Sequence, residues 1–287
     1  VMEQRLAEMG HFDSHVDLGL KVYGKHNKKV RAKYNIYFKT AYTYRSLQFY
    51  NQHTVADSLI ASAMSKSLIV PGKDYWLKDL EEERDRLSMM LKNKGHYFFN
   101  PDFLLFHADT AVAKKQVDLT LIIKDEITPK AFNQYSIRNV NVFVKSDKKK
   151  TVPMDSIFIN DCNYKSSGHI FRPEIITRPL TLKPGGIYTF IKHENTLRYL
   201  QGMEAFRSVD ISFNEVDSSS NQLDANISLV PSKPILTSLE VNFATKSNDF
   251  LGPAAIATIG HRNIFKGAEQ LTLQIDGGFE WQKRSKT

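Results

Sequence analysis

The chain has 287 residues, of which 41% are hydrophobic, and a net charge of +8 at pH 7. This length predicts two or more domains. No stretch reaches the roughly 18 apolar residues that a membrane-spanning helix requires. The single cysteine, Cys162, excludes an internal disulfide framework, and nothing beside it signals a reactive thiol.

The organisation of the chain follows from three phrases that recur. One carries a Tyr-x-x-Arg core, one begins with Pro-Gly, and one ends a helical stretch, in two of its copies with Gly-His. The copies occur in the same order: residues 42–49 and 135–142; residues 71–75 and 184–188; and residues 6–12, 91–97 and, more weakly, 200–206. Recurrence in a fixed order indicates one small structural unit that is repeated along the chain.

The first copy is incomplete. The chain begins inside a helix, in which apolar residues four apart run into Gly10, a residue that can close a helix in the left-handed conformation. Alternating apolar residues then predict two strands, at residues 16–22 and 34–38. Residues 1–39 are therefore expected to be the C-terminal part of a truncated unit.

Residues 40–127 are expected to form a complete unit. The first strand carries the Tyr-x-x-Arg phrase, and Pro71 separates two helices, of which the second ends at Gly95. Strands at residues 103–106 and 117–121 complete the order strand, helix, helix, strand, strand.

Residues 132–232 repeat this order and include a strand at residues 209–213. Tyr188, like its counterpart in the preceding unit, is expected to anchor the start of the second helix in the core. Glu204 stands where the other copies carry glycine, so this helix is expected to end differently. The predicted fold class is α+β: tandem β-α-α-β-β units, each a three-stranded sheet with two helices on one face.

Residues 235–287 change character, because no helical period appears in them. Leu239, Val241 and Phe243 alternate with polar residues, and similar alternation returns after residue 270. Segments of about ten residues with weak alternation are typical of transmembrane β-barrel strands, although a soluble β-meander has the same pattern. We expect these residues to be the first strands of an incomplete transmembrane barrel, with Leu239, Val241 and Phe243 on one side of its seam.

The repeated phrases and the last segment together carry a resemblance to a known family. The repeats resemble polypeptide-transport-associated (POTRA) domains, and the pair Leu251-Gly252 followed by residues 261–269 is similar to the opening strands of the outer-membrane barrels that follow such domains. The chain thus resembles the barrel-assembly superfamily of BamA, TamA, Sam and Toc translocases, with the nearest likeness to Bacteroidetes proteins that include the lipoprotein TamL. The turn residues of this match are Arg262, Asn263, Phe265, Gly267 and Glu269.

The resemblance implies a location and a role. The POTRA units would lie in the periplasm of a Gram-negative bacterium, and the barrel in its outer membrane. The protein would be a non-enzymatic assembly or translocation component that binds unfolded chains and delivers them to the barrel. Its implied partners are unfolded outer-membrane protein clients, outer-membrane lipid, and accessory lipoproteins or an inner-membrane TamB-like protein. Family members carry a dozen or more further strands, so their lid loop and closing strand have no counterpart here.

A small open sheet leaves an edge strand whose N–H and C=O groups can template an extended peptide. The resemblance places this free edge on the strand after the second helix, and residues 103–106 are favoured because they are apolar on both faces. A proline at Leu105 is then expected to weaken crosslinking to an unfolded client. The alternative is that the edges pack on neighbouring units. The predicted client-binding residues are Phe103, Leu104, Leu105, Phe106, Val209, Ile211 and Phe213.

Other classes of function have little support. Basic clusters at residues 25–31 and 145–150 are expected to be solvated turns or a loop that touches anionic lipid, and no nucleic-acid-binding motif accompanies them. No phosphate loop, nucleophile elbow or metal-ligand spacing appears, so we expect no catalytic residue, cofactor or metal. The carboxylates of residues 79–85 are expected to form the polar face of a helix. The alternative function is a soluble, repeat-type interaction scaffold that ends in a β-meander, and further alternating strands after Thr287 would favour the barrel instead.

Overall fold

The structure is a computed structural model, in which the chain forms two compact units, Val1–Gln134 and Tyr135–Thr287. It describes every residue except 24–28, 51–54, 112, 146–153, 218–219, 246–249, 280 and 283–287. Most of both predicted basic clusters therefore lies outside the described residues.

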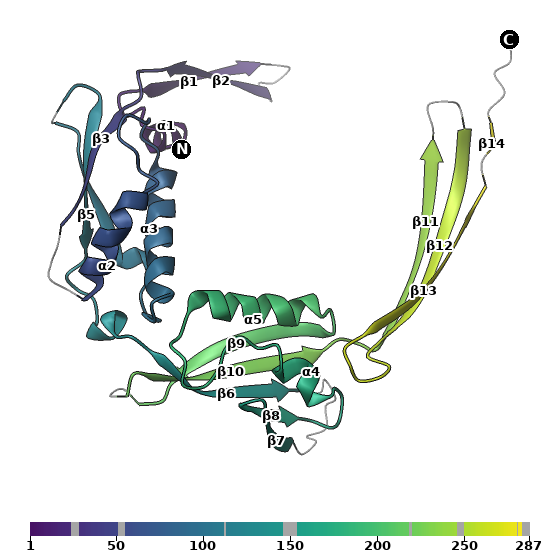
Figure 1. Ribbon diagram of the computed structural model, residues 1–287. Helices are drawn as coiled ribbons and strands as arrows, with labels where there is room; N and C mark the ends of the chain where they lie inside the picture. The colour runs from purple at the N-terminus through teal and green to yellow at the C-terminus, as the bar shows by residue number, and fades with distance from the viewer. Residues whose placement is uncertain are drawn as a thin grey trace, which may run out of the picture. The chain divides into compact units, whose positions relative to one another are not determined.

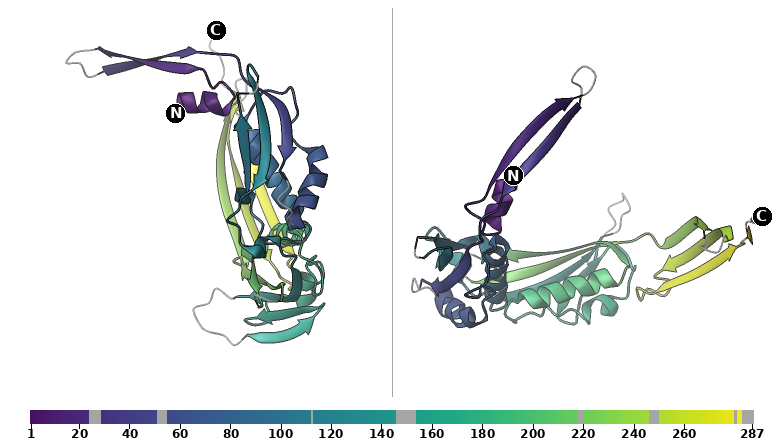
Figure 2. Two further views of the ribbon diagram at one scale, coloured as in Figure 1. Left: turned by 90° about the vertical axis from the view of Figure 1, so that its left-hand side faces the viewer. Right: turned by 90° about the horizontal axis from the view of Figure 1, so that it is seen from above.

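The first unit begins with the helix α1 (Met2–Glu8) and a two-stranded antiparallel ribbon of β1 (His15–Tyr23) and β2 (Lys29–Tyr37) (Figure 2). One face of the ribbon is apolar and open, and Leu18 and Leu20 on it are 53% and 63% exposed. An isolated two-stranded pair is at best marginally stable. The helix and the two strands that were predicted here are confirmed, and their place in a larger unit stays a prediction.

A three-stranded sheet covered by two helices follows (Figure 1). Its strand order is β3-β5-β4, with β3 parallel and β4 antiparallel to the central strand. The elements are β3 (Thr43–Phe49), α2 (Val55–Ala63), α3 (Leu77–Lys92), β4 (Leu104–Asp109) and β5 (Gln116–Ile123), with 3-10 turns η2 (Met64–Lys66), η3 (Pro101–Phe103) and η4 (Pro129–Phe132). This is the β-α-α-β-β order that the sequence predicts.

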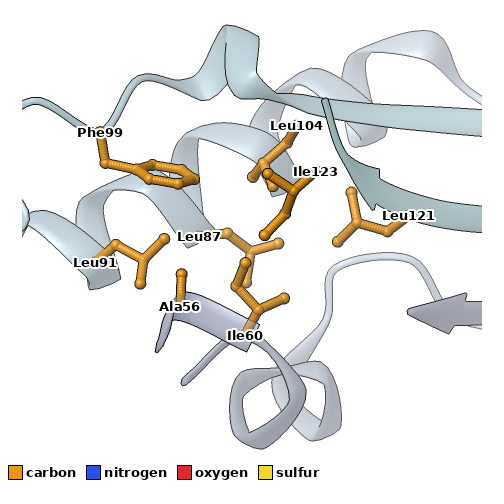
Figure 3. Packing of buried hydrophobic residues seen from close by; sticks show 8 residues of the cluster. All are labelled: Ala56, Ile60, Leu87, Leu91, Phe99, Leu104, Leu121 and Ile123. Atoms are coloured by element: carbon orange, nitrogen blue, oxygen red, sulfur yellow. The ribbon is translucent and has the colours of Figure 1, made fainter. Parts of the chain in front are cut away.

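The core of this sheet lies between its helix-facing side and the two helices. Central strand β5 alternates strictly between buried and half-buried residues, as a strand covered on one face should. Figure 3 shows side chains from α2, α3, β4 and β5 converging. The buried members of this cluster are Ala56, Ile60, Leu87, Leu91, Phe99, Leu104, Leu121 and Ile123.

The second unit contains a larger sheet, with strand order β7-β8-β6-β10-β9. Helix α5 runs along one of its faces (Figures 1 and 2). The elements are β6 (Ser136–Val144), β7 (Asp155–Ile159), β8 (Cys162–Ser166), α4 (Pro173–Thr177), α5 (Phe190–Gly202), β9 (Phe206–Glu215) and β10 (Gln222–Pro231).

The expectation of three strands is therefore too few for this unit. The extra hairpin, β7–β8, lies in sequence between the first strand and the first helix, and β8 pairs in parallel with β6. Its connection is Asn160-Asp161, whose φ angles of 49° and 62° are both positive, as the tight type I′ hairpin turn requires. The helix after it, α4, has only five residues.

The helix ends are alike in all three copies, so the different end expected at Glu204 is wrong. Gly10 and Gly95 have φ angles of 81° and 100°, and Glu204 has a φ of 52°. In each copy this residue's N–H donates to the carbonyl three residues earlier, at 3.0, 3.2 and 3.1 Å. Glu204 thus adopts a left-handed backbone conformation that glycine accepts more readily.

In each unit, the Pro-Gly phrase is hydrogen-bonded to the strand that carries the Tyr-x-x-Arg phrase. The Gly72 N–H donates to the Tyr44 carbonyl (2.7 Å), and the Tyr44 N–H donates to the Lys73 carbonyl (2.8 Å). The second unit repeats this pattern, because Gly185 N–H donates to the Ile137 carbonyl at 2.7 Å. The Pro-Gly phrase therefore lies along the outer side of the first strand. The tyrosines that follow it, Tyr75 and Tyr188, are buried as predicted.

In both copies, the arginine of the Tyr-x-x-Arg phrase lies in a β-bulge. Arg45 is the extra residue where the β3–β5 register shifts, and Arg138 is the extra residue where β6 meets β10. Each guanidinium bonds both oxygens of an aspartate on the neighbouring strand; in the second unit Arg138 reaches Asp224 at 3.0 and 2.6 Å, and Arg45 reaches Asp118. The repeat thus preserves one interstrand ion pair.

The acidic stretch of α3 is not only a polar face. Glu83 is fully buried and accepts two hydrogen bonds of 2.7 Å from Arg86. It also accepts one from the Leu68 N–H (3.1 Å), and Arg86 donates to the Ala63 carbonyl (3.1 Å). This buried pair ties α3 to the end of α2 and the segment after it.

The second unit also contains a separate sheet of long antiparallel strands, at the end of the chain. These are β11 (Ile235–Thr245), β12 (Phe250–Arg262), β13 (Gln270–Gly278) and the short β14 (Trp281–Gln282). β12 is central, and β11 pairs with it over eleven residues. The strands predicted from the alternation after residue 235 are thus present.

Candidate functional site

Strand β4 is an edge strand of its sheet, but its residues are not equally accessible to a partner strand. Leu104 is fully buried, and Phe106 packs partly buried against the core. Phe103 precedes the strand, in η3, and its ring lies 5.6 Å from that of Phe99. Leu105 is 37% exposed on the opposite face. Of the four predicted residues at 103–106, only Leu105 is therefore exposed, and only on the face of the sheet away from the helices.

Strand β9 is an edge strand of the five-stranded sheet in the second unit, and its two faces differ in polarity. Val209, Ile211 and Phe213 are half-buried, and their cross-strand partners on β10 belong to the core. The Phe213 ring meets the His193 ring of α5 at 5.1 Å. The alternate residues are polar and exposed: Ser208, Asp210, Ser212 and Asn214.

The ladder decides which backbone groups face the free edge. Opposed residues of an antiparallel pair alternately exchange two hydrogen bonds or point their N–H and C=O groups away from each other. The Val216 N–H donates to the Gln222 carbonyl at 3.0 Å, and the register is continuous from there to Val209. Val209 and Ile211 therefore direct their N–H and C=O groups toward the free edge.

The same reasoning corrects the proline test on β4. The Lys124 N–H donates to the Phe103 carbonyl at 2.9 Å, so with the register of this pair Leu105 bonds to β5. A proline at Leu105 would break the sheet ladder instead of the edge. Phe106 and Ala108 face the edge, and Ala108 is exposed.

The opposite edges of the two sheets are partly covered. The Pro-Gly phrase bonds to the first half of β3 and of β6, and β8 pairs with β6 from Val140 to Val144. The outer strand on this side of the second unit is consequently β7, which exposes Ile157 and Phe158 by 43% and 72%. Sequence reasoning missed this edge, and the Asn160-Asp161 turn was the signal for it.

Strand β11 is an edge strand of the last sheet, and its place at a barrel seam stays a prediction. Leu239, Val241 and Phe243 lie on one face and are 73%, 62% and 74% exposed. The Arg262 N–H donates to the Pro234 carbonyl at 2.7 Å, so the ladder directs the backbone groups of these three residues away from β12. Leu239, Val241 and Phe243 thus combine an open apolar face with an open backbone edge.

The predicted turn motif joins β12 to β13 and is internally hydrogen-bonded. The Asn263 N–H donates to the Glu269 carbonyl (2.6 Å), and Asn263 Oδ1 accepts from the Ala268 N–H (3.1 Å). The Glu269 carboxylate accepts from the N–H groups of Phe265 and Gly267. The bond from the Phe265 N–H is the strongest cause of the lowered pKa of Glu269, followed by the other contacts of the carboxylate. Asn263 and Glu269 therefore hold the turn from both ends.

Within the described residues, no group of three or more His, Cys, Asp or Glu side chains is placed to hold a metal ion. Burial raises the pKa of the Cys162 thiol, whose Sγ donates to the Asn160 carbonyl at 3.4 Å. Of the described helices, none is long and apolar enough to cross a membrane.

Comparison with known proteins identifies the fold. No protein-family model matches the chain, and no curated protein matches it. It is similar to the solved structure of BamA from Haemophilus ducreyi lacking POTRA domains 1–3, with a TM-score of 0.51 and 12% identity over 83% of this chain and 37% of that chain. It is also similar to POTRA3–5 of Haemophilus influenzae BamA, with a TM-score of 0.49 and 12% identity over 80% of this chain and 76% of that one.

The likeness to the Haemophilus ducreyi protein shows a shared α+β fold of POTRA-type units and barrel strands. The chain spans little more than a third of the length of that BamA structure, at 37%.

Proposed function

We propose that the chain belongs to an outer-membrane protein assembly or translocation component of a Gram-negative bacterium. In this proposal residues 40–127 and 132–232 are periplasmic POTRA units, residues 1–39 end another, and residues 235–287 open a transmembrane barrel. The units bind unfolded outer-membrane protein clients by strand addition and pass them to the barrel, without catalysis. The POTRA-type fold supports this role.

The observation that carries the proposal is the two-faced edge of β9. An extended client that pairs with Val209 and Ile211 would place every second side chain on the apolar face of the sheet, which α5 covers. Its alternate side chains would lie over the exposed polar residues, among them Asp210 and Ser212. Transmembrane barrel strands have this alternation of apolar and polar residues. β9 therefore suits an unfolded barrel strand better than a uniformly polar or uniformly apolar peptide.

The test is photocrosslinking from Ser212 of the full-length protein to an unfolded barrel precursor. Ile211→Pro removes one edge-facing N–H without removing a bond to β10, and it is expected to abolish the crosslink. Ile211→Ala keeps the N–H and should weaken the crosslink less. Undiminished crosslinking in the proline variant, with β10 amides still protected from hydrogen exchange, would refute strand addition at β9.

The equivalent test on β4 uses Ala108→Pro, which is expected to reduce crosslinking from this edge while leaving the β4–β5 ladder intact. His107→Pro is the matched control, because the His107 backbone bonds to β5. It should destabilise the sheet itself.

The soluble interaction scaffold is the second candidate. The exposed apolar face and open backbone of β11 argue against it, because such an edge promotes aggregation in water. Partition of the full-length protein into liposomes would favour the barrel, and a stable monomer without detergent would favour the scaffold.

The narrower predictions concern a TamL-type lipoprotein, accessory lipoproteins and a TamB-like inner-membrane partner, and they stay predictions. A lipidated cysteine upstream of Val1 would support the first.

A further inference from the structure

The turn between β12 and β13 is longer and has more left-handed residues than a connection between two antiparallel strands requires. Asn263, Lys266 and Ala268 have φ angles of 70°, 61° and 61°. This left-handed conformation is unfavourable for lysine and alanine, and two residues suffice to connect a hairpin. Strained backbone persists only where surrounding contacts hold it, so the contacts of this turn indicate what its shape serves.

Those contacts reach the loop that precedes α4. The Arg172 N–H donates to the Lys266 carbonyl (2.8 Å), and the Arg172 guanidinium donates to the Phe265 carbonyl (2.8 Å). In return, the Asn263 side-chain amide donates to the Ile170 carbonyl (2.7 Å). The left-handed turn thus presents two successive carbonyls to one arginine.

The loop is firmly attached to the β6–β10 sheet. Phe171 is 4% exposed, and its ring lies 5.1 Å from that of Phe206 at the start of β9. The Ser166 hydroxyl at the end of β8 donates to the Gly168 carbonyl (2.6 Å). Arg172 itself is the N-cap residue of α4. A force on the turn is therefore transmitted to the sheet core.

We propose that Arg172 and Asn263 form a latch that fixes the direction in which β11–β13 leave the sheet of β6–β10. The chain connects these two sheets through residues 232–234, and one short connection leaves rotation about itself open. The latch supplies a second attachment and so removes that rotation. It depends only on the described contacts and not on the assembly function proposed above.

The test is a distance measurement by double electron–electron resonance on the full-length protein in detergent. Spin labels are placed at the exposed residues Asn195 on α5 and Gln274 on β13. The unmodified latch is expected to give one narrow distance distribution. Both Arg172→Ala and Arg172→Lys keep the backbone N–H that donates to Lys266. Arg172→Ala removes the side-chain bond to Phe265 and should broaden the distribution, and Arg172→Lys, which keeps the charge and a side-chain donor, should broaden it less.

Two further variants make the result decisive. Asn263→Gly keeps the left-handed backbone accessible while removing the side-chain bonds to the Ile170 carbonyl and the Ala268 N–H, and it should broaden the distribution as well. Arg198→Ala, at an exposed position on α5, is the control and should leave the distribution unchanged. If Arg172→Ala and Asn263→Gly both keep the wild-type distribution while hydrogen exchange shows the sheets intact, the latch is refuted.

Discussion

The end of α5 offers a quantitative test of backbone strain in this fold. Glu204 is exposed and has a φ of 52°, in the position that Gly10 and Gly95 occupy in the other copies. A left-handed non-glycine residue costs about 1–2 kcal/mol, whereas glycine loses about 0.5–1 kcal/mol more conformational entropy on folding. The difference predicts that Glu204→Gly raises the free energy of unfolding by about 0.5–1 kcal/mol.

Hydrogen exchange of the β9 and β10 amides measures this change in the unit concerned. The gain corresponds to roughly two- to five-fold slower exchange through unfolding. Glu204→Ala is the control, because it keeps the backbone strain while removing a negative charge near a helix C terminus, which is itself unfavourable. If the glycine variant is no more stable than the alanine variant, strain at this position is not the cause and the reasoning fails.

Three further predictions concern the first unit. The Arg45 guanidinium lowers the pKa of Asp118 to about 2, so its contribution to stability is present above about pH 4 and is lost as the pH falls toward 2; urea titrations of Asp118→Asn and wild type should converge in acid. Glu83→Ala leaves Arg86 without its buried partner and is expected to cost about 3–5 kcal/mol in urea unfolding, and a loss below 1 kcal/mol would contradict the buried pair. Burial lowers the pKa of His96, so its contribution is present above about pH 6.5 and is lost as the pH falls below it; replacement by Gln should flatten the stability profile between about pH 7 and 5.

The order of strands and helices could be predicted because alternation and helix-ending residues are local signals. The strands of residues 40–127 and the β11–β13 sheet came from such signals. The β7–β8 hairpin was missed because its turn, Asn160-Asp161, lacks the glycine that usually marks positive φ angles. The end of α5 was mispredicted because a helix can also end in the left-handed conformation at a residue other than glycine, here Glu204.

The candidate edges could be predicted only at the level of strands. Which residue directs its N–H toward a free edge depends on the register with the neighbouring strand, and the sequence does not contain that register. This is why Leu105, an exposed apolar residue, was the wrong place for a proline. Glu83 makes the same point for helices, because its burial arises from the Arg86 pair and the segment after α2, not from its position in an acidic stretch.

The free edges of β9 and β11 share one physical pattern. On β9 the residues that direct their backbone toward the edge, Val209 and Ile211, have apolar side chains, and polar residues alternate with them. On β11 the corresponding residues, Leu239 and Val241, are also apolar and alternate with polar ones. In an antiparallel pair, directly opposed residues share a face, so a client strand in register with β9 would find the same alternation at β11. Transfer between the two edges would then need no change in which client residues face apolar surface, and a client shifted by one residue would mismatch both.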